Sequence, residues 1–128
     1  MRLVRDPVYG EVDLTASAEE LNRLAVAVAE GEGQFGSTPS PGRHDLAGVE
    51  VGKTSGPGVR LHLDSLRQIL VISGDSAARA VFADNLRAMA AAEDGGHLHV
   101  DYFPDHPYLV KGSLPLVVNS PHGGMPIR

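Results

Sequence analysis

Apolar and polar positions form their clearest pattern between residues 68 and 103, where they predict a strand, a helix and a second strand. Residues 69–72 are a continuous apolar run of strand length, which is typical of a strand covered on both faces. From residue 97 to residue 103 the pattern alternates, so Leu98 and Val100 point to one side and the polar residues between them to the other.

The helix in this stretch has recognisable ends and one apolar face. Asp75 or Ser76 is expected to cap its first turn, because a side-chain oxygen there can accept a hydrogen bond from a free main-chain amide. Residues 94–96, Asp-Gly-Gly, are expected to end it, since glycine adopts left-handed angles without a steric penalty. The apolar face consists of Ala78, Phe82, Leu86 and Met89.

The first part of the chain predicts a similar strand and helix. Residues 11–14 read as a short strand, and an earlier strand is expected at residues 2–5. Thr15 or Ser17 would cap the following helix, and Glu20 stands three residues after Ser17, as in a capping box. Residues 31–41 are rich in glycine and proline and read as a loop.

The remaining segments predict further short strands. Residues 59–64 alternate cleanly and read as a strand, and residues 46–51 read as a shorter one. Residues 108–111 and 114–119 read as a hairpin, or as one bent strand around Gly112. Residues 120–128 are expected to be the frayed tail of a single domain that spans residues 1–128.

Two short stretches resemble each other, since Leu61-His-Leu-Asp matches Leu98-His-Val-Asp almost residue for residue. We therefore predict an α+β fold, in which two strand–helix–strand repeats place two helices on one face of a mostly antiparallel sheet of about five or six strands. The predicted core is Leu21, Leu24, Val28, Leu61, Leu63, Leu70, Ile72, Phe82, Leu86, Met89, Leu98, Val100 and Val117.

The composition fits a small globular protein with an acidic balance. The chain has 128 residues, a net charge of −5 and no cysteine. An acidic chain suits a phosphate backbone poorly, so we expect no nucleic-acid partner. A basic protein surface would be complementary, although the charge also serves simply to keep the domain soluble. We find no signal peptide and no apolar run long enough for a bilayer, so we expect a cytoplasmic protein without a membrane partner.

The strongest candidate for chemistry is His97-x-His99-x-Asp101, because a spacing of two on a strand places three side chains on one face. If the repeat holds, His62 and Asp64 would join them on the sheet face opposite the helices. Such a row suits zinc or iron, but histidines on an exposed strand more often form a protein contact or are simply solvated.

Two glycine motifs resemble nucleotide-binding sequences but lie in the wrong context. Residues 31–36 match G-x-G-x-x-G, yet they follow a predicted helix instead of preceding one. Residues 48–54 resemble a phosphate loop with the wrong glycine spacing and no helix after it. No serine lies in a Gly-x-Ser-x-Gly elbow. The sequence therefore predicts neither a catalytic residue nor a cofactor.

The second half also carries a series of short motifs, namely Leu70-Val-Ile-Ser-Gly, the helix, His97-Leu-His-Val-Asp and Gly112-Ser-Leu-Pro-Leu-Val-Val. Together they resemble the immunity protein 32 family of bacterial polymorphic toxin systems, and compatible residues extend the resemblance back to about Gly10. The resemblance implies an α+β protein that binds and neutralises a cognate toxin and is not an enzyme. The alternative hypothesis is a small metal-binding protein or metal-dependent enzyme that uses the His-x-His-x-Asp strand.

The polar sheet face is the surface that we expect a toxin to contact. Tyr102 and Phe103 end the same strand and would supply the apolar anchor that protein interfaces usually contain. The sequence leaves a homo-oligomer open as well. The predicted partner-binding residues are His62, Asp64, His97, His99, Asp101 and Tyr102.

Overall fold

The computed structural model describes residues 1–6, 8, 10–37, 45–92 and 96–119, and over these residues it contains two helices and eight strands. The predicted tail at 120–128 and most of the predicted helix stop at 94–96 lie outside the described residues. In chain order the elements are β1 (Arg2–Arg5), β2 (Val12–Thr15), α1 (Ala18–Glu30), β3 (Gly33–Gly36), β4 (Gly48–Lys53), β5 (Val59–Asp64), β6 (Ile69–Gly74), α2 (Ser76–Ala91), β7 (His97–Val100) and β8 (Leu116–Asn119).

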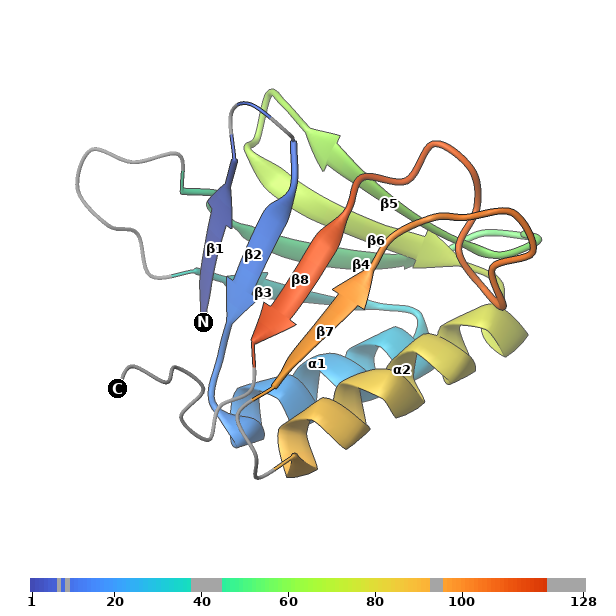
Figure 1. Cartoon of the computed structure of the whole chain (residues 1–128), viewed down its shortest axis with the longest axis horizontal. Coiled ribbons are helices and arrows are strands. Elements are labelled where there is room, and N and C mark those ends of the chain that lie inside the picture. Colours follow the sequence, from blue (N-terminus) through green and yellow to red (C-terminus); the bar gives the residue numbers. More distant parts are fainter. Residues whose placement is uncertain (7, 9, 38–44, 93–95, 120–128) are drawn as a thin grey trace.

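The strands form two four-stranded sheets, which lie one in front of the other in Figure 1. Sheet A has the order β1-β2-β8-β7, and sheet B has the order β3-β4-β6-β5. In each sheet the two central strands are parallel and the outer pairs are antiparallel. The predicted α+β class with two helices and mostly antiparallel pairing is confirmed. The prediction of one sheet is corrected to two, because the strands of each half are divided between the sheets.

Each half of the chain has the same order of elements: a hairpin, a helix and a second hairpin. The first hairpin of one half pairs with the second hairpin of the other, so β2 lies beside β8 and β6 lies beside β4. As a result, β1 and β5 occupy equivalent edge positions in the two sheets, and so do β3 and β7. Neither half can complete a sheet without strands of the other.

This arrangement corrects the predicted repeat at one point. The strand after the first helix is β3, at Gly33–Gly36, in a segment that was expected to be a loop. Glycine has low strand propensity, but β4 supplies a full antiparallel ladder to this strand. Residues 61–64 and residues 98–101 are therefore similar in sequence, but their strands, β5 and β7, do not occupy equivalent places in the fold.

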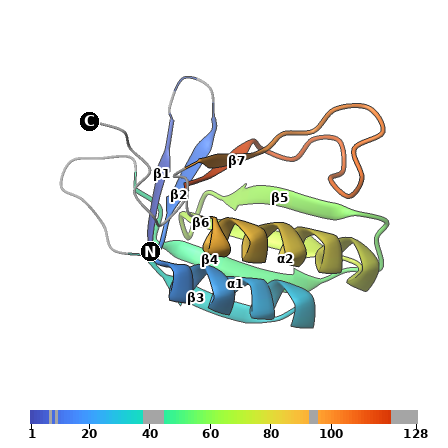
Figure 2. The ribbon, with the colours of Figure 1, turned by 60° about the horizontal axis from the view of Figure 1, so that its bottom comes forward.

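The two helices lie side by side and close one side of the space between the sheets (Figures 1 and 2). The predicted capping box at the start of α1 is confirmed, because the Ser17 hydroxyl accepts from the amide of Glu20 and the Glu20 carboxylate accepts from the amide of Ser17. Gly31 ends α1 in the left-handed conformation. Asp75 occupies the cap position of α2, but its side chain makes no capping hydrogen bond there.

One apolar core joins both sheets and both helices. Alternate residues of each strand point into this core and the others point outward, as the pleat requires. Of the predicted core, Leu63 and Leu98 are partly buried against it, and the others are buried. Val117 is buried as well, yet it stands apart from the main core, on the outer face of sheet A.

Candidate functional site

The residues predicted to share one polar face are divided between the two sheets. His97 and His99 lie on β7, at one edge of sheet A, whereas His62 and Asp64 lie on β5, at one edge of sheet B. The prediction that all of them line a single face is therefore wrong. The physical reason is the exchange of hairpins between the halves, which no local pattern in the sequence reveals.

The outer face of sheet A carries a hydrogen-bonded polar cluster. His97 Nδ1 lies 2.6 Å from Asn119 Oδ1 on the neighbouring strand β8. The amide nitrogen of Asn119 donates in turn to Asp13 Oδ1 at 3.2 Å and to Thr15 Oγ1 at 3.1 Å, both on β2. Since this orientation makes Asn119 Oδ1 the acceptor, His97 donates through Nδ1. We name Asp13, Thr15, His97, His99, Val117 and Asn119 the sheet A face.

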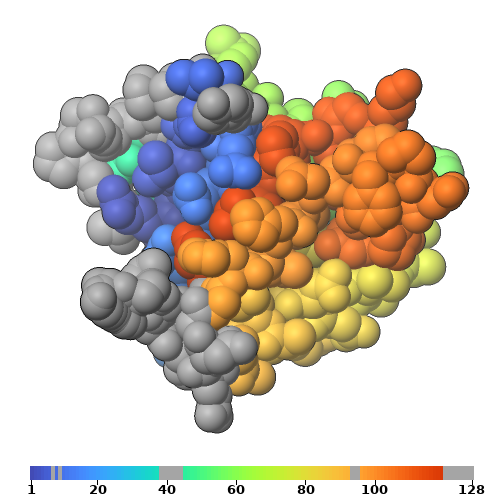
Figure 3. Space-filling view, viewed as in Figure 1, coloured from blue at the N-terminus to red at the C-terminus, as the bar shows by residue number. Residues whose placement is uncertain are grey.

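An apolar side chain lies at the centre of the sheet A face. Val117 pairs with Asp13 on one side and with His99 on the other, and only 6% of its surface is exposed. The rings of His97 and His99 approach edge to face, with centroids 6.2 Å apart. Figure 3 shows this side of the molecule, where the N-terminal strands (blue) lie beside residues 97–119 (orange to red). The face thus combines polar groups that are oriented by hydrogen bonds with one apolar side chain between them.

Asp101 and Tyr102 continue this surface beyond the end of β7, and both are exposed. Phe103 is exposed over 52% of its surface, and its ring lies 4.7 Å from the ring of His106. The predicted group of His97, His99, Asp101 and Tyr102 is therefore contiguous along the chain and accessible.

The outer face of sheet B carries a different polar arrangement. Arg67 donates to Asp64 at 2.8 Å and to Glu50 at 2.7 Å, and Gln34 reaches the same Glu50 at 3.4 Å. The hydrogen bonds from Arg67 lower the pKa of both carboxyls. Asp64 is thus already paired within the protein, while Nδ1 of His62 is buried and lacks a hydrogen-bond partner among the described residues.

The alternative metal hypothesis finds no cluster of ligands in the described part of the chain. Within residues 1–6, 8, 10–37, 45–92 and 96–119, no three or more His, Cys, Asp or Glu side chains gather closely enough to hold an ion. The His-x-His-x-Asp row extends along β7 and past its end, and His62 and Asp64 belong to the other sheet.

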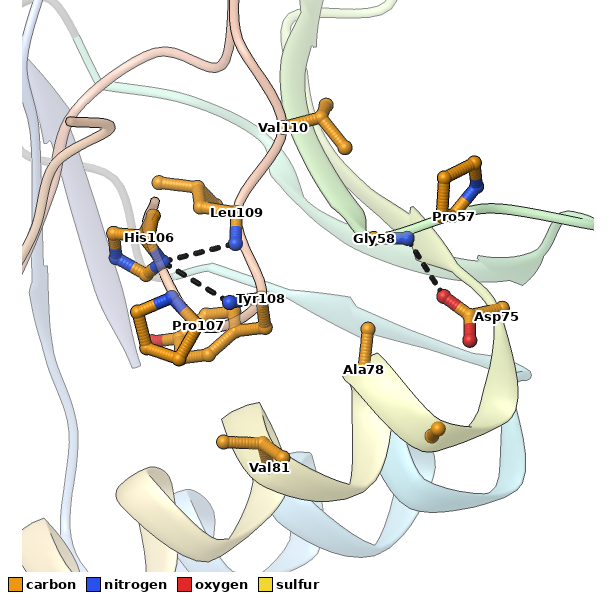
Figure 4. Close-up of a pocket in the computed structure, with 11 residues that line it drawn as sticks. Pro57, Gly58, Asp75, Ala78, Val81, His106, Pro107, Tyr108, Leu109 and Val110 are labelled. Atoms are coloured by element: carbon orange, nitrogen blue, oxygen red, sulfur yellow. Dashed lines mark hydrogen bonds between the residues drawn. The ribbon is translucent and has the colours of Figure 1, made fainter. Parts of the chain in front are cut away.

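A pocket of about 430 Å³ opens beside the first turns of α2 (Figure 4). Its walls come from residues 57–58, from α2 and from residues 106–110. His106 shapes one side, because its Nδ1 accepts the main-chain amides of Tyr108 at 3.2 Å and Leu109 at 2.9 Å. Burial lowers the pKa of His106. The imidazole is therefore neutral at pH 7, with its proton on Nε2.

Tyr108 ties this wall to α2. Its ring stacks on Phe82 with centroids 5.5 Å apart, and its hydroxyl accepts a hydrogen bond of 3.1 Å from the Asn85 amide. Burial raises the pKa of the Tyr108 hydroxyl. On the opposite side in Figure 4, Asp75 accepts the Gly58 amide at 2.7 Å, and this bond lowers the pKa of the carboxyl.

Sequence reasoning missed the pocket and half of the sheet A face. The alternation of residues 12–15 places Asp13 and Thr15 on one side of a strand, which was a usable signal. Their partner Asn119 is about a hundred residues away, and only the parallel pairing of β2 with β8 brings it near. Residues 104–107 read as a turn, with no sign that His106 organises a pocket wall.

The family model for immunity protein 32 matches residues 69–121, which include β6, α2, β7 and β8. The resemblance noted from the sequence is thereby confirmed over this stretch, and its extension to the first half stays a prediction. No curated protein matches the chain. No solved structure matches it either. Among the described residues no helix has the length and apolar character needed to cross a membrane.

Proposed function

We propose that this chain is an immunity protein, which binds and neutralises a cognate toxin of a bacterial polymorphic toxin system in the cytoplasm of the producing cell, without catalysing a reaction. The observation that carries the proposal is the match of residues 69–121 to the immunity protein 32 family. The acidic balance supports it further, because a net charge of −5 favours encounter with a basic protein.

The sheet A face, with Asp101 and Tyr102 beside it, is the contact surface that we propose. Neutralisation without chemistry requires a stable complex, which typically buries about 1,200–2,000 Å². Polar groups that are already held by hydrogen bonds lose little conformational freedom on binding. His97, fixed by Asn119, meets this condition. His62 and Asp64 would form a separate contact from sheet B, and the pairing of Asp64 with Arg67 makes it the weaker candidate.

The test is co-expression with the toxin domain encoded beside the gene for this chain. We expect cells that make both proteins to grow, and cells that make the toxin alone to stop. The purified chain should form a stoichiometric complex with that toxin domain in light scattering and calorimetry. A toxin domain from an unrelated system is the control, and the chain should neither bind it nor protect against it. A folded, soluble chain that gives no protection would contradict the proposal.

A further inference from the structure

Main-chain hydrogen bonds hold one wall of the pocket beside α2. Residues 108–110 are fixed to the start of β5, because the Val59 amide donates to the Tyr108 carbonyl at 2.7 Å and the Val110 amide donates to the Val59 carbonyl at 2.9 Å. Gly58 lets these segments approach closely, since a Cβ at that position would lie 2.5 Å from Val110 Cγ1. The pocket is therefore present before any ligand binds, and its volume is in the range of ordinary ligand sites.

Most of the residues that line the pocket are apolar, although polar atoms expose almost as much of its surface. Val81 lies on α2 at the open side and exposes 42% of its surface, and Pro107 and Val110 lie across from the helix. Phe103 extends the apolar rim through its contact with His106. An occupant must therefore bring aliphatic or aromatic surface.

A single ionised side chain faces this apolar lining. Among the described residues that line the pocket, Asp75 is the one carboxylate, and none of them is a Lys or an Arg. Within the described residues Asp75 takes part in no ion pair. The nearby cation Arg79 is buried, and it donates to main-chain carbonyls instead. His106 is neutral and neither repels a cation nor attracts an anion.

These features select the class of occupant. An anionic group would meet the charge of Asp75 without a compensating cation. A purely apolar group would cover a carboxylate that holds the Gly58 amide but has no counter-ion among the described residues. A long aliphatic side chain with a cationic end satisfies both parts, because its stem packs on apolar walls while its head pairs with the carboxylate. Arginine suits such a place better than lysine, since its guanidinium is less strongly hydrated and matches a carboxylate with two donors.

We propose that this pocket binds an arginine side chain of the partner toxin and thereby anchors the edge of the interface. This inference rests on the proposed immunity function, because it takes the toxin as the source of the arginine. Residues 102–106 connect Asp101, beside the sheet A face, to the pocket wall at His106, so we expect one partner to cover both.

The first experiment needs no toxin and uses the whole chain. N-acetyl-arginine amide is titrated into the labelled protein while the amide resonances of Gly58, Val81 and Leu109 are followed by NMR. We expect saturable shifts with a dissociation constant on the order of millimolar, as befits one side chain. N-acetyl-citrulline amide has nearly the same shape without the charge, and it should bind about tenfold more weakly. Equal shifts from the two compounds, or no shifts from either, would overturn the inference.

The matched variants are Asp75→Asn and Asp84→Asn. Asparagine preserves the size of Asp75 and an oxygen that can accept the Gly58 amide, and it removes only the charge, so a thermal melt should stay near that of the wild type. Asp84 lies on the same helix, outside the pocket, and its side chain pairs with Arg87 at 3.1 Å. We expect Asp75→Asn to weaken binding of the arginine compound about tenfold and Asp84→Asn to leave it unchanged. Equal affinities in the two variants would overturn the inference.

The second experiment measures the affinity of the toxin domain for the same variants. A loss of about tenfold or more in Asp75→Asn, with no loss in Asp84→Asn, supports the inference. If the wild type binds the toxin tightly and Asp75→Asn binds equally well, the pocket is not the anchor, although the immunity function stands. If the wild type does not bind the toxin at all, the proposed function fails, and so does the assignment of the arginine to that partner.

Discussion

The guanidinium of Arg79 on α2 donates a hydrogen bond of 2.9 Å to the main-chain carbonyl of Val28 on α1. It also donates to the carbonyls of Ala29 and Gly74, each at 2.8 Å, and only 4% of the residue is exposed. The last carbonyls of a helix lack partners within the helix and carry its negative dipole end. One buried cation thus completes the end of α1, holds the two helices together and reaches the end of β6.

Replacing this cation should destabilise the protein strongly. Arg79→Met keeps much of the aliphatic stem but removes the guanidinium donor from the carbonyls of Val28 and Ala29, while the Gly74 carbonyl keeps the Thr54 amide. We therefore expect a loss of about 2–4 kcal/mol in the free energy of unfolding. Urea denaturation monitored by circular dichroism measures it. Arg79→Lys retains a charge that reaches fewer carbonyls and should lose less than the methionine variant. A loss below about 1 kcal/mol in Arg79→Met would show that water replaces the guanidinium at little cost.

Gly31 is constrained by the same contact. Its φ is +84°, and a Cβ there would lie 2.7 Å from Arg79 Nη1 and 2.5 Å from the Lys53 side chain. Gly31→Ala should therefore cost about 1–3 kcal/mol, from backbone strain plus displacement of Arg79. Gly10→Ala measures the backbone strain alone, because Gly10 has a φ of +72° and open space around it. Urea denaturation should show a smaller loss of unfolding free energy for Gly10→Ala than for Gly31→Ala. Equal losses would mean that moving the Arg79 side chain aside does not destabilise the protein.

The second half of the fold was the more predictable part. The apolar run at 69–72, the face of α2 with Phe82 and Leu86, and the alternation of β7 are local patterns, and the strand, helix and strand that they predict are confirmed. Cover on both faces of the run at 69–72 is not confirmed, because only Leu70 and Ile72 are buried in it. The α1 capping box is equally local. These features depend on neighbours within a turn of helix or a few residues of strand, which a sequence displays directly.

The partition into two sheets could not be predicted in this way. Both central pairings are parallel and join different halves of the chain, as for Val12 beside Leu116 and Val49 beside Leu70. A parallel pairing depends on tertiary packing and leaves no turn signal between its strands. The same cause separated His62 from His99. Arg79 was missed because an arginine within an alanine-rich helix ordinarily indicates a solvated position.

His106 should make the stability of the protein depend on pH. Burial lowers the pKa of His106 below the 6.5 of a free histidine, so the unfolded chain takes up this proton more readily than the folded one. The contribution of His106 is fully present above pH 6.5. It falls as the pH drops below 6.5 towards the lowered pKa of the folded state, where protonation would remove the acceptor for the amides of Tyr108 and Leu109.

The measurement is the free energy of unfolding by urea at several pH values between about 7.5 and 5. The informative quantity is the difference between the wild type and His106→Asn, because every other group contributes alike to both proteins. The asparagine oxygen can accept the same amides and does not titrate. We expect the wild type to lose stability more steeply than the variant as the pH falls. Parallel curves would assign the pH dependence to residues other than His106.

The contact surface itself is tested by paired substitutions on the two sheets. His99→Ala with Asp101→Ala removes exposed groups at the β7 edge of sheet A, so the melting temperature should change little while the toxin affinity falls about tenfold or more. His62→Ala with Asp64→Ala makes the same change on sheet B, where it also releases Arg67 from one of its two carboxylates. We expect this second pair to lower stability slightly, because a partly exposed ion pair contributes at most about 1 kcal/mol, and to leave the affinity near that of the wild type. Calorimetry with the purified toxin domain, together with survival of the co-expressing cells, distinguishes the surfaces. Full toxin affinity in a well-folded sheet A double variant would show that the interface does not include the β7 edge. A loss of toxin affinity in the sheet B double variant alone would place the interface over β5, because the substituted side chains lie on that strand.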